Sequence, residues 1–214
     1  MNEEAFEHPV YEKNVIEFVT VVNEYCGFVE KADSFSKRNF ISKAQKLLPL
    51  LYLKASLLPD VESMQDEENE KFVTEGDYHM IYHTIHEKLG EDDDYLEVFD
   101  PMMQESEGPI PQSIAENFSD IYQDIKDFVM VYRVGTIEVM NDALWELNMG
   151  FANDWGQKLV NVIRAIHMVQ FKKDDESDAQ GNTSKYDDID PDTVNTDDYL
   201  ISKIMRNYSN NDEQ

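Results

Sequence analysis

Hydrophobic residues recur every three or four positions through most of the first 171 residues, which is the spacing of helices with one buried face. Residues 10–30 carry the first such stripe. Residues 36–55 carry the second, behind Ser36, a residue type favoured at helix N-caps. Pro49 lies inside the second pattern, so we expect it to kink or split that helix. The first quarter of the chain therefore predicts two helices.

Further helical patterns follow an acidic, polar loop expected over residues 60–74. Asp77 is expected to cap a helix that stops at Gly90, and Ser113 and Glu116 have the spacing of a capping box. No strand or hairpin pattern competes with this interpretation. The helices expected in this part of the chain cover residues 77–89, 95–99 (after Asp92, Asp93 and Asp94), 113–132, 137–147 and 153–171. Residues 1–173 are thus predicted to form an all-α fold, a single bundle of about six helices.

The composition changes after Lys173. Residues 174–214 are rich in Asp, Ser, Asn and Thr and poor in apolar residues, so we expect an acidic, disordered C-terminal tail. Helical spacing returns in residues 198–208, which predict a short amphipathic helix near the end of the tail. Such a segment can dock on its own bundle or on a partner, and docking on its own bundle is the simpler expectation.

Charge separates the predicted framework from its connections. The chain has 45 Asp and Glu against 18 Lys and Arg, a formal charge of −27. Most of the excess lies in residues 59–77, 87–107 and 174–214, whereas the remaining segments are nearly neutral. This balance argues against binding to nucleic acid or to an anionic membrane, since both need basic residues. A basic protein partner is compatible with it, and no oligomeric state is indicated.

The compartment follows from two further observations. Cys26 is the single cysteine, so it cannot form a disulfide within the chain, and it fits a reducing environment. The N-terminal residues are acidic and lack the basic and apolar regions of a signal peptide, and no segment is apolar enough to span a bilayer. We therefore expect a cytoplasmic protein.

Three histidines form a candidate metal site on one predicted helix. His79, His83 and His86 fall within about 60° of one another at helical spacing. Neutral imidazoles in that arrangement can bind a metal ion, with a carboxylate completing the set. The competing interpretation is three partly exposed polar residues, and it is favoured because no HExxH or similar motif supports the metal.

Three aspartates form a second candidate. Asp120, Asp124 and Asp127 share one face of a predicted helix, where like charges repel. A divalent cation would offset that repulsion, as would a facing base such as Lys158 or Arg164. A solvated charged face is the simpler interpretation. No other cofactor is indicated.

Other motifs are weaker. No GxSxG, Walker or GxGxxG sequence is present. Cys26 lies on an apolar stripe and is expected to be a packed core thiol. Trp145 and Trp155 flank Gly150; they could wall a pocket, but core anchors are the ordinary expectation for aromatic residues.

Several pieces of the chain together resemble a bacterial family catalogued as domain of unknown function 5063: NEYCGFVE, LLPLLYLKA, EDDDYLEVFDPMM, IYQDIKDFVMVYRVGT, MNDALWE and WGQKLVNVIRAIH. The resemblance covers residues 10–171. It implies a compact, all-helical cytoplasmic domain, but no activity, cofactor or catalytic residue. The family signature is expected to centre on Tyr25, Leu48, Pro49, Tyr52, Asp142, Trp145, Trp155 and Gly156.

The leading functional hypothesis is therefore a non-enzymatic protein-interaction or regulatory module. The alternative is a metal-dependent hydrolase that acts on nucleotides or phosphoesters through helix-borne carboxylates.

Overall fold

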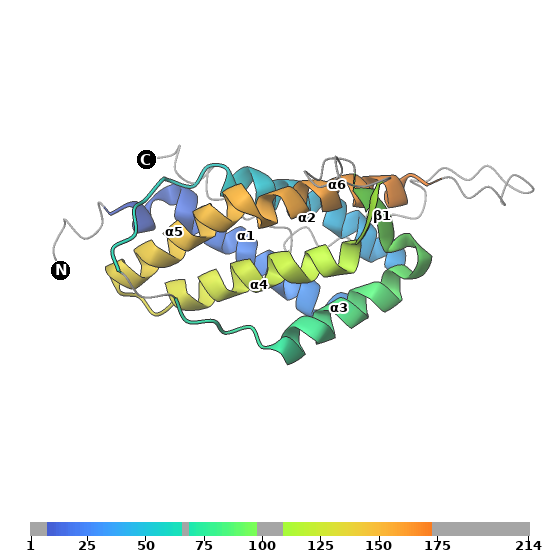
Figure 1. The fold of residues 1–214 in the computed structure, drawn as a ribbon, viewed down its shortest axis with the longest axis horizontal. Coiled ribbons are helices and arrows are strands. Elements are labelled where there is room, and N and C mark those ends of the chain that lie inside the picture. The colour runs from blue at the N-terminus through green and yellow to red at the C-terminus, as the bar shows by residue number, and fades with distance from the viewer. Residues whose placement is uncertain (1–7, 66–68, 98–108, 173–214) are drawn as a thin grey trace, which may run out of the picture. The chain divides into compact units, whose positions relative to one another are not determined.

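The structure, a computed structural model, describes residues 8–65, 69–97 and 109–172. In these residues the chain forms a bundle of six α-helices with one short two-stranded ribbon (Figure 1). The helices are α1 (Lys13–Glu30), α2 (Lys37–Ala55), α3 (Glu75–Leu89), α4 (Ile114–Tyr132), α5 (Ile137–Asn153) and α6 (Trp155–Gln170). The predicted all-α bundle of about six helices is confirmed. The predicted tail, 174–214, and its helix near 198–208 lie outside the described residues.

Helix ends follow the local sequence with three corrections. Ser36 caps α2 as predicted, and its Oγ accepts a hydrogen bond from Asn39 N. Thr74, rather than Asp77, is the N-cap of α3, and the two residues form a reciprocal capping box. Pro49 does not split α2, which runs through it. Gly90 ends α3 as expected, with a positive φ of 57°. The fifth helix does not stop at its last predicted residue but continues to Asn153.

The main difference from the prediction is a β-ribbon. Of the helix predicted over residues 95–99, the described residues 95–97 instead belong to β1 (Asp94–Glu97), which pairs antiparallel with β2 (Ile110–Ser113). The buried Asp93 explains why the chain is held here: its Oδ1 accepts a hydrogen bond from Ala115 N at 2.7 Å, and its carbonyl accepts one from Ile114 N at 2.9 Å. Asp93 thus caps the start of α4 and not a helix of its own.

The core is built from aromatic side chains of α1, α2 and α4. Tyr25 is fully buried, and its ring stacks on Phe118 with 6.0 Å between centroids. Its hydroxyl donates to the Phe118 carbonyl at 3.0 Å, which satisfies the polar group inside the core. Phe40 lies against the other side, 5.5 Å from Phe118 and 4.8 Å from Phe28. Cys26 is buried beside this cluster, and burial raises the pKa of its thiol to about 12.

A tight corner joins α5 to α6, with only Asp154 between the two helices. The buried Trp155 donates its indole N–H to the Leu147 carbonyl at 3.2 Å and so ties the start of α6 back to α5. A Cβ on Gly156 would lie 2.1 Å from the Phe151 carbonyl oxygen, so no other residue fits there without a shift of the backbone. This corner brings Trp155 under the C-terminal half of α5.

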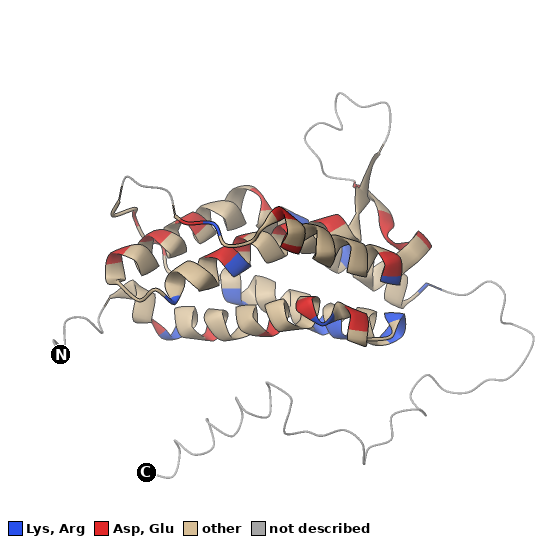
Figure 2. Ribbon diagram, turned by 90° about the horizontal axis from the view of Figure 1, so that it is seen from below, with Lys and Arg blue, Asp and Glu red and all other residues tan. Residues whose placement is uncertain are grey.

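Charge on the surface is distributed over most of the bundle. Figure 2 shows acidic residues on several helices, interspersed with a smaller number of basic ones. Within the described residues, no helix combines the length and the apolar character needed to cross a membrane.

Candidate functional site

A cavity of about 320 Å³ opens between α4 and α5. It lies at the lower end of the range of small-ligand sites, about 300–1,000 Å³. Its walls come from both helices, from the first residue of α6 and from the segment before α3: Asn69, Glu70, Lys71, Asp124, Asp127, Phe128, Val131, Ala143, Trp145, Glu146, Leu147, Met149, Gly150 and Trp155. The floor is apolar, and the described residues of the rim carry four carboxyl groups and one ammonium group.

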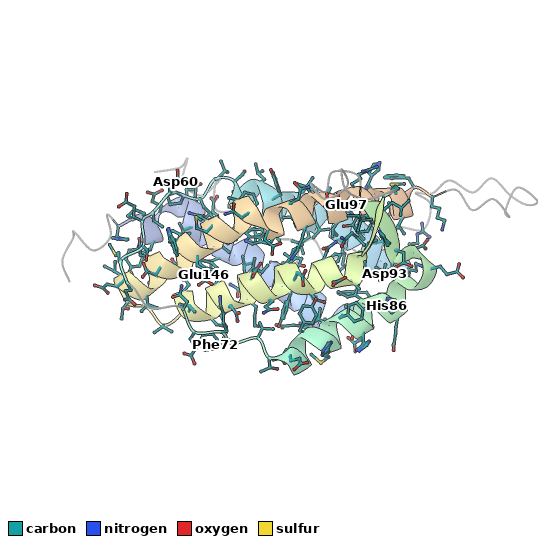
Figure 3. All side chains as sticks on the ribbon, in the orientation of Figure 1. Asp60, Phe72, His86, Asp93, Glu97 and Glu146 are labelled. Carbon is teal, nitrogen blue, oxygen red and sulfur yellow. The ribbon has the colours of Figure 1, made fainter. Side chains whose placement is uncertain are left out.

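One wall is a segment of extended chain that two acidic side chains fix in place. Asp127 is 4% exposed, and its Oδ1 accepts hydrogen bonds from the backbone N–H groups of Phe72 (2.7 Å) and Val73 (2.8 Å). Glu146 of α5 accepts from Asn69 Nδ2 at 2.8 Å and from the ammonium group of Lys71. Figure 3 shows Glu146 and Phe72 at this edge of the bundle. These carboxylates are therefore occupied in building the cavity wall.

The preceding part of the same connection is also attached to α5. Asn148 Nδ2 donates to the Pro59 carbonyl at 2.9 Å, and Asn141 Nδ2 donates to the Glu62 carbonyl at 2.7 Å. Asp142 Oδ1 accepts from Met64 N at 2.6 Å. The loop predicted over residues 60–74 is confirmed for the described residues 60–65 and 69–74. The sequence did not predict that polar side chains of α4 and α5 would bind the loop's backbone along its length.

Asp124 is the half-buried acid of the cavity that has no protein partner. Neither Asp124 nor the exposed Glu70 forms a hydrogen bond or ion pair with a residue that the structure describes, whereas Asp127 and Glu146 do. Burial raises the pKa of its carboxyl group to about 6, and the carboxylate of Asp154 adds to the increase, whereas Lys158 and Lys71 oppose it. Lys158 gives little relief because it already pairs with Asp120 at 2.8 Å and with Asp154 at 2.9 Å. Asp124 is thus a half-buried acid that faces a cavity and lacks a cation.

Both tryptophans of the chain line the same cavity. Trp155 is fully buried and forms part of the floor, as a core anchor does. Trp145 of α5 is 38% exposed, so part of its indole ring is accessible at the rim. The sequence left open whether these residues are core anchors or walls of a pocket, and the structure assigns both roles to Trp155.

The three candidate aspartates of α4 lie in three different environments. Asp120 accepts a hydrogen bond from the Tyr78 hydroxyl at 2.7 Å and pairs with Lys158, the facing base that the sequence suggested. Asp127 binds backbone N–H groups, and only Asp124 has a carboxylate without such partners. The solvated face that the sequence favoured for all three does not hold for Asp127, which is buried, because the helix spacing contained no information about the loop that covers it.

The candidate histidines of α3 remain near the surface. The rings of His79 and His83 lie 6.1 Å apart, whereas His86 Nδ1 lies 2.8 Å from Asp93 Oδ2. That contact raises the pKa of the His86 imidazole. Figure 3 shows His86 and Asp93 facing each other beside the ribbon. Across residues 8–65, 69–97 and 109–172, no three His, Cys, Asp or Glu side chains are grouped so as to hold a metal ion.

Comparison with known proteins places this architecture in a family. A family model described as a domain of unknown function, DUF5063, matches residues 9–172, which agrees with the resemblance seen over residues 10–171. The fold is similar to the crystal structure of protein BF1032 from Bacteroides fragilis, with 44% sequence identity and a TM-score of 0.70. That match covers 78% of this chain and 98% of the other. A search of curated proteins finds no match.

Proposed function

The chain belongs to the DUF5063 family, and we propose that it is a cytoplasmic, non-enzymatic interaction module whose α4–α5 cavity receives a basic side chain of a protein partner. The observation that carries this proposal is the Asp124 carboxyl group, which lines the cavity and has no hydrogen bond or ion pair within the described part of the chain. Partial burial disfavours the charged form of this carboxyl group and raises its pKa to about 6. A cation entering the cavity offsets this penalty on the charged form.

The rest of the cavity suits the same ligand. Glu70, Asp127 and Glu146 add negative charge around Asp124, and Lys71 is the one base of the lining. The accessible indole of Trp145 offers an apolar surface for the methylene stem of lysine or arginine. A cation over an indole ring gains a further contribution of about 0.5–2 kcal/mol. The volume of about 320 Å³ fits a side chain better than a large cofactor.

Figure 3 places Glu146 at the edge of this region, next to the extended segment that contains Phe72. Because Glu146 and Asp127 also bind that segment, their charges face the cavity from fixed positions. A cavity whose charges are already positioned loses less entropy on binding than a mobile one. This supports binding as the role of the site, and it requires no reacting group.

The metal-dependent hydrolase remains a prediction without a supporting contact. Two of its proposed ligands, Asp120 and Asp127, use their carboxylates for protein donors. A metal ion would have to displace those donors.

The chain provides its own reporter for the experiment. Trp145 and Trp155 are the two tryptophans of the sequence and both line the cavity, so intrinsic fluorescence reports on this site. Short synthetic peptides that carry arginine, lysine or glutamine between glycines are titrated into the full chain at low salt. We expect the arginine or lysine peptide to change the emission in a saturable way and the glutamine peptide to have no such effect.

The decisive variant is Asp124→Asn, which removes the charge and keeps the shape. It should abolish the response, whereas Asp60→Asn, the same change at an exposed acid outside the cavity, should not. Equal responses to the basic and neutral peptides, or an unchanged response in Asp124→Asn, would refute the proposal.

A further inference from the structure

Two helices of this acidic chain contain no acidic residue. Although 45 of the 214 residues are Asp or Glu, α2 has five Lys or Arg and α6 has two, with no Asp or Glu in either helix. Acidic residues flank both helices along the chain, so their absence inside the helices is a local property. It sets these two helices apart from the remainder of the bundle.

The two acid-free helices lie side by side and run antiparallel (Figure 1). At one end, Asp92 pairs with Lys37 at the start of α2 and with Lys172 just after α6, both at 2.7 Å. At the other end, the ring of Tyr52 near the end of α2 lies 5.3 Å from Phe151, just before α6. The absence of acids therefore extends over a continuous pair of helices.

The outward sides of α2 and α6 combine free bases with exposed apolar residues. Arg38, Lys46 and Arg164 are exposed, and none of them makes an ion pair with a described residue. Lys37 and Lys172 both pair with Asp92 and so mark the same end of the two helices. Lys46 and Arg164 lie at similar distances along the helix axes from that end, because the rise is about 1.5 Å per residue.

Three apolar side chains of this surface are strongly exposed: Leu53 at 52%, Val160 at 42% and Met168 at 62%. Leu53 and Val160 lie towards the end of the helix pair where Tyr52 contacts Phe151. Arg38, the first of the unpaired bases, lies at the opposite end, near the start of α2. We name the surface formed by Arg38, Lys46, Leu53, Val160, Arg164 and Met168 the α2–α6 face.

We infer that the α2–α6 face is a docking surface for an acidic, amphipathic helix of a protein partner. Carboxylates of the partner pair with Arg38, Lys46 and Arg164, and its apolar side chains cover Leu53, Val160 and Met168. Recognition of an amphipathic helix by an apolar surface with charged residues alongside is an established mode of binding. This surface is separate from the α4–α5 cavity and takes a partner of the opposite charge.

Charge selects an acidic helix over a second copy of the chain, nucleic acid or an anionic membrane. A second copy docking through the same face would bring bases against bases, which repels. Nucleic acid and anionic membranes carry extended negative charge, which a chain with a formal charge of −27 repels. A short acidic helix covers a smaller surface and can contact Arg38, Lys46 and Arg164 directly. Acidic residues border this surface at Arg164 and Met168, which also line a cavity with Glu91, Asp92, Asp94 and Glu97. The exposed Leu53, Val160 and Met168 also match the apolar side of a helix better than a phosphate backbone.

The experiment measures the binding of designed helical peptides to the full chain. One labelled peptide of about five helical turns carries leucine on one side and glutamate on the other, and its matched peptide has lysine in place of glutamate. Fluorescence anisotropy gives the dissociation constants at low and high salt. We expect the glutamate peptide to bind, to weaken as salt rises, and to bind at least about tenfold more tightly than the lysine peptide.

Variants then locate the site. Lys46→Glu combined with Arg164→Glu should weaken the glutamate peptide by about tenfold or more, and Leu53→Ser should weaken both peptides. Arg133→Glu makes the same kind of charge change at the exposed C-cap of α4 and should leave binding unchanged. Should the glutamate substitutions prevent folding, Lys46→Gln with Arg164→Gln tests the same contacts.

The inference is overturned when the glutamate peptide fails to bind, when it binds no better than the lysine peptide, or when the variants of Lys46 and Arg164 leave its binding unchanged. A duplex DNA oligonucleotide that competes it away at equal concentration also counts against a protein helix as the occupant.

Discussion

Replacing Asp124 by asparagine should stabilise the protein above neutral pH, although it removes a charged group that we assign to binding. The structural reason is the half-buried carboxyl group, whose pKa rises from 3.8 to about 6. An acid whose pKa is raised on folding lowers stability when it ionises. Its penalty is absent well below pH 4, grows as the pH rises from about 4 to about 6, and is constant above that range.

The size of the penalty follows from the same values. An increase of the pKa from 3.8 to about 6 corresponds to about 3 kcal/mol in the free energy of unfolding. Solvent reaches part of the side chain and screens its charge, so we expect about 1–2 kcal/mol. Asparagine has the same shape and no charge, so Asp124→Asn should gain that amount at pH 7.5 and distinctly less at pH 5.

Urea unfolding at pH 5, 6 and 7.5 measures the effect, with tryptophan emission as the signal. Asp60→Asn is the matched control, because its exposed carboxyl should change the stability little at any pH. The reasoning is refuted when Asp124→Asn is less stable than the original chain at pH 7.5, or when the difference between the two does not grow with pH. A group that lowers stability is typical of positions where the group is needed for binding.

Other consequences of the structure are tested more simply. Gly156→Ala should destabilise the protein by about 3 kcal/mol or more, since the new Cβ would lie 2.1 Å from a carbonyl oxygen. Gly27→Ala, in the middle of α1 where a Cβ meets no other atom within 4 Å, should stabilise the protein by up to about 1 kcal/mol, and urea unfolding compares the two variants. The Cys26 thiol, with a pKa of about 12, should react with a thiol reagent at pH 8 at the rate of unfolding, and fast labelling of the folded chain would contradict its burial. Asp127→Ala should cost about 2–4 kcal/mol, as two backbone N–H groups lose their acceptor, and Asp127→Asn less; equal effects would contradict this account. A thermal-shift series with Mg²⁺, Mn²⁺ and Zn²⁺ tests the hydrolase, which needs a rise in Tm at metal concentrations near the Kd.

Hydrophobic spacing was sufficient to predict the helices because each buries one face. The predicted stripe of α4 is an example. Seven of its eight residues are buried and the eighth, Tyr132, is half-buried; the buried ones are Ile114, Phe118, Ile121, Tyr122, Ile125, Phe128 and Val129. The spacing failed for β1, because a run of four residues such as Asp94–Glu97 is too short to separate a strand from a helix. Its partner β2 lies more than ten residues further along the chain, so local sequence carried no signal for the pairing.

The cavity was less predictable than the fold for a physical reason. Its wall is a polar segment bound to polar side chains, and such contacts leave no hydrophobic pattern. The sequence around Asp127 was typical of a solvated helix face. Its carboxylate instead accepts a hydrogen bond from the backbone N–H of Phe72, 55 residues earlier in the chain. Trp145 and Trp155 were the one usable signal, because two tryptophans around a glycine suggested a pocket.

The two proposed binding surfaces differ in charge and should act independently. Arg164 lies nine residues after Trp155, the point where α6 meets the cavity, and this separation is roughly 13 Å along the helix. Substitutions that far apart and without a shared partner usually have additive effects, within about 0.5 kcal/mol. In the double variant Asp124→Asn with Arg164→Glu, the affinity for each peptide should therefore fall by the same factor as in the single variant that affects that peptide. A coupling well above that value, from anisotropy titrations of both peptides against the four proteins, would show that the cavity and the α2–α6 face form one site.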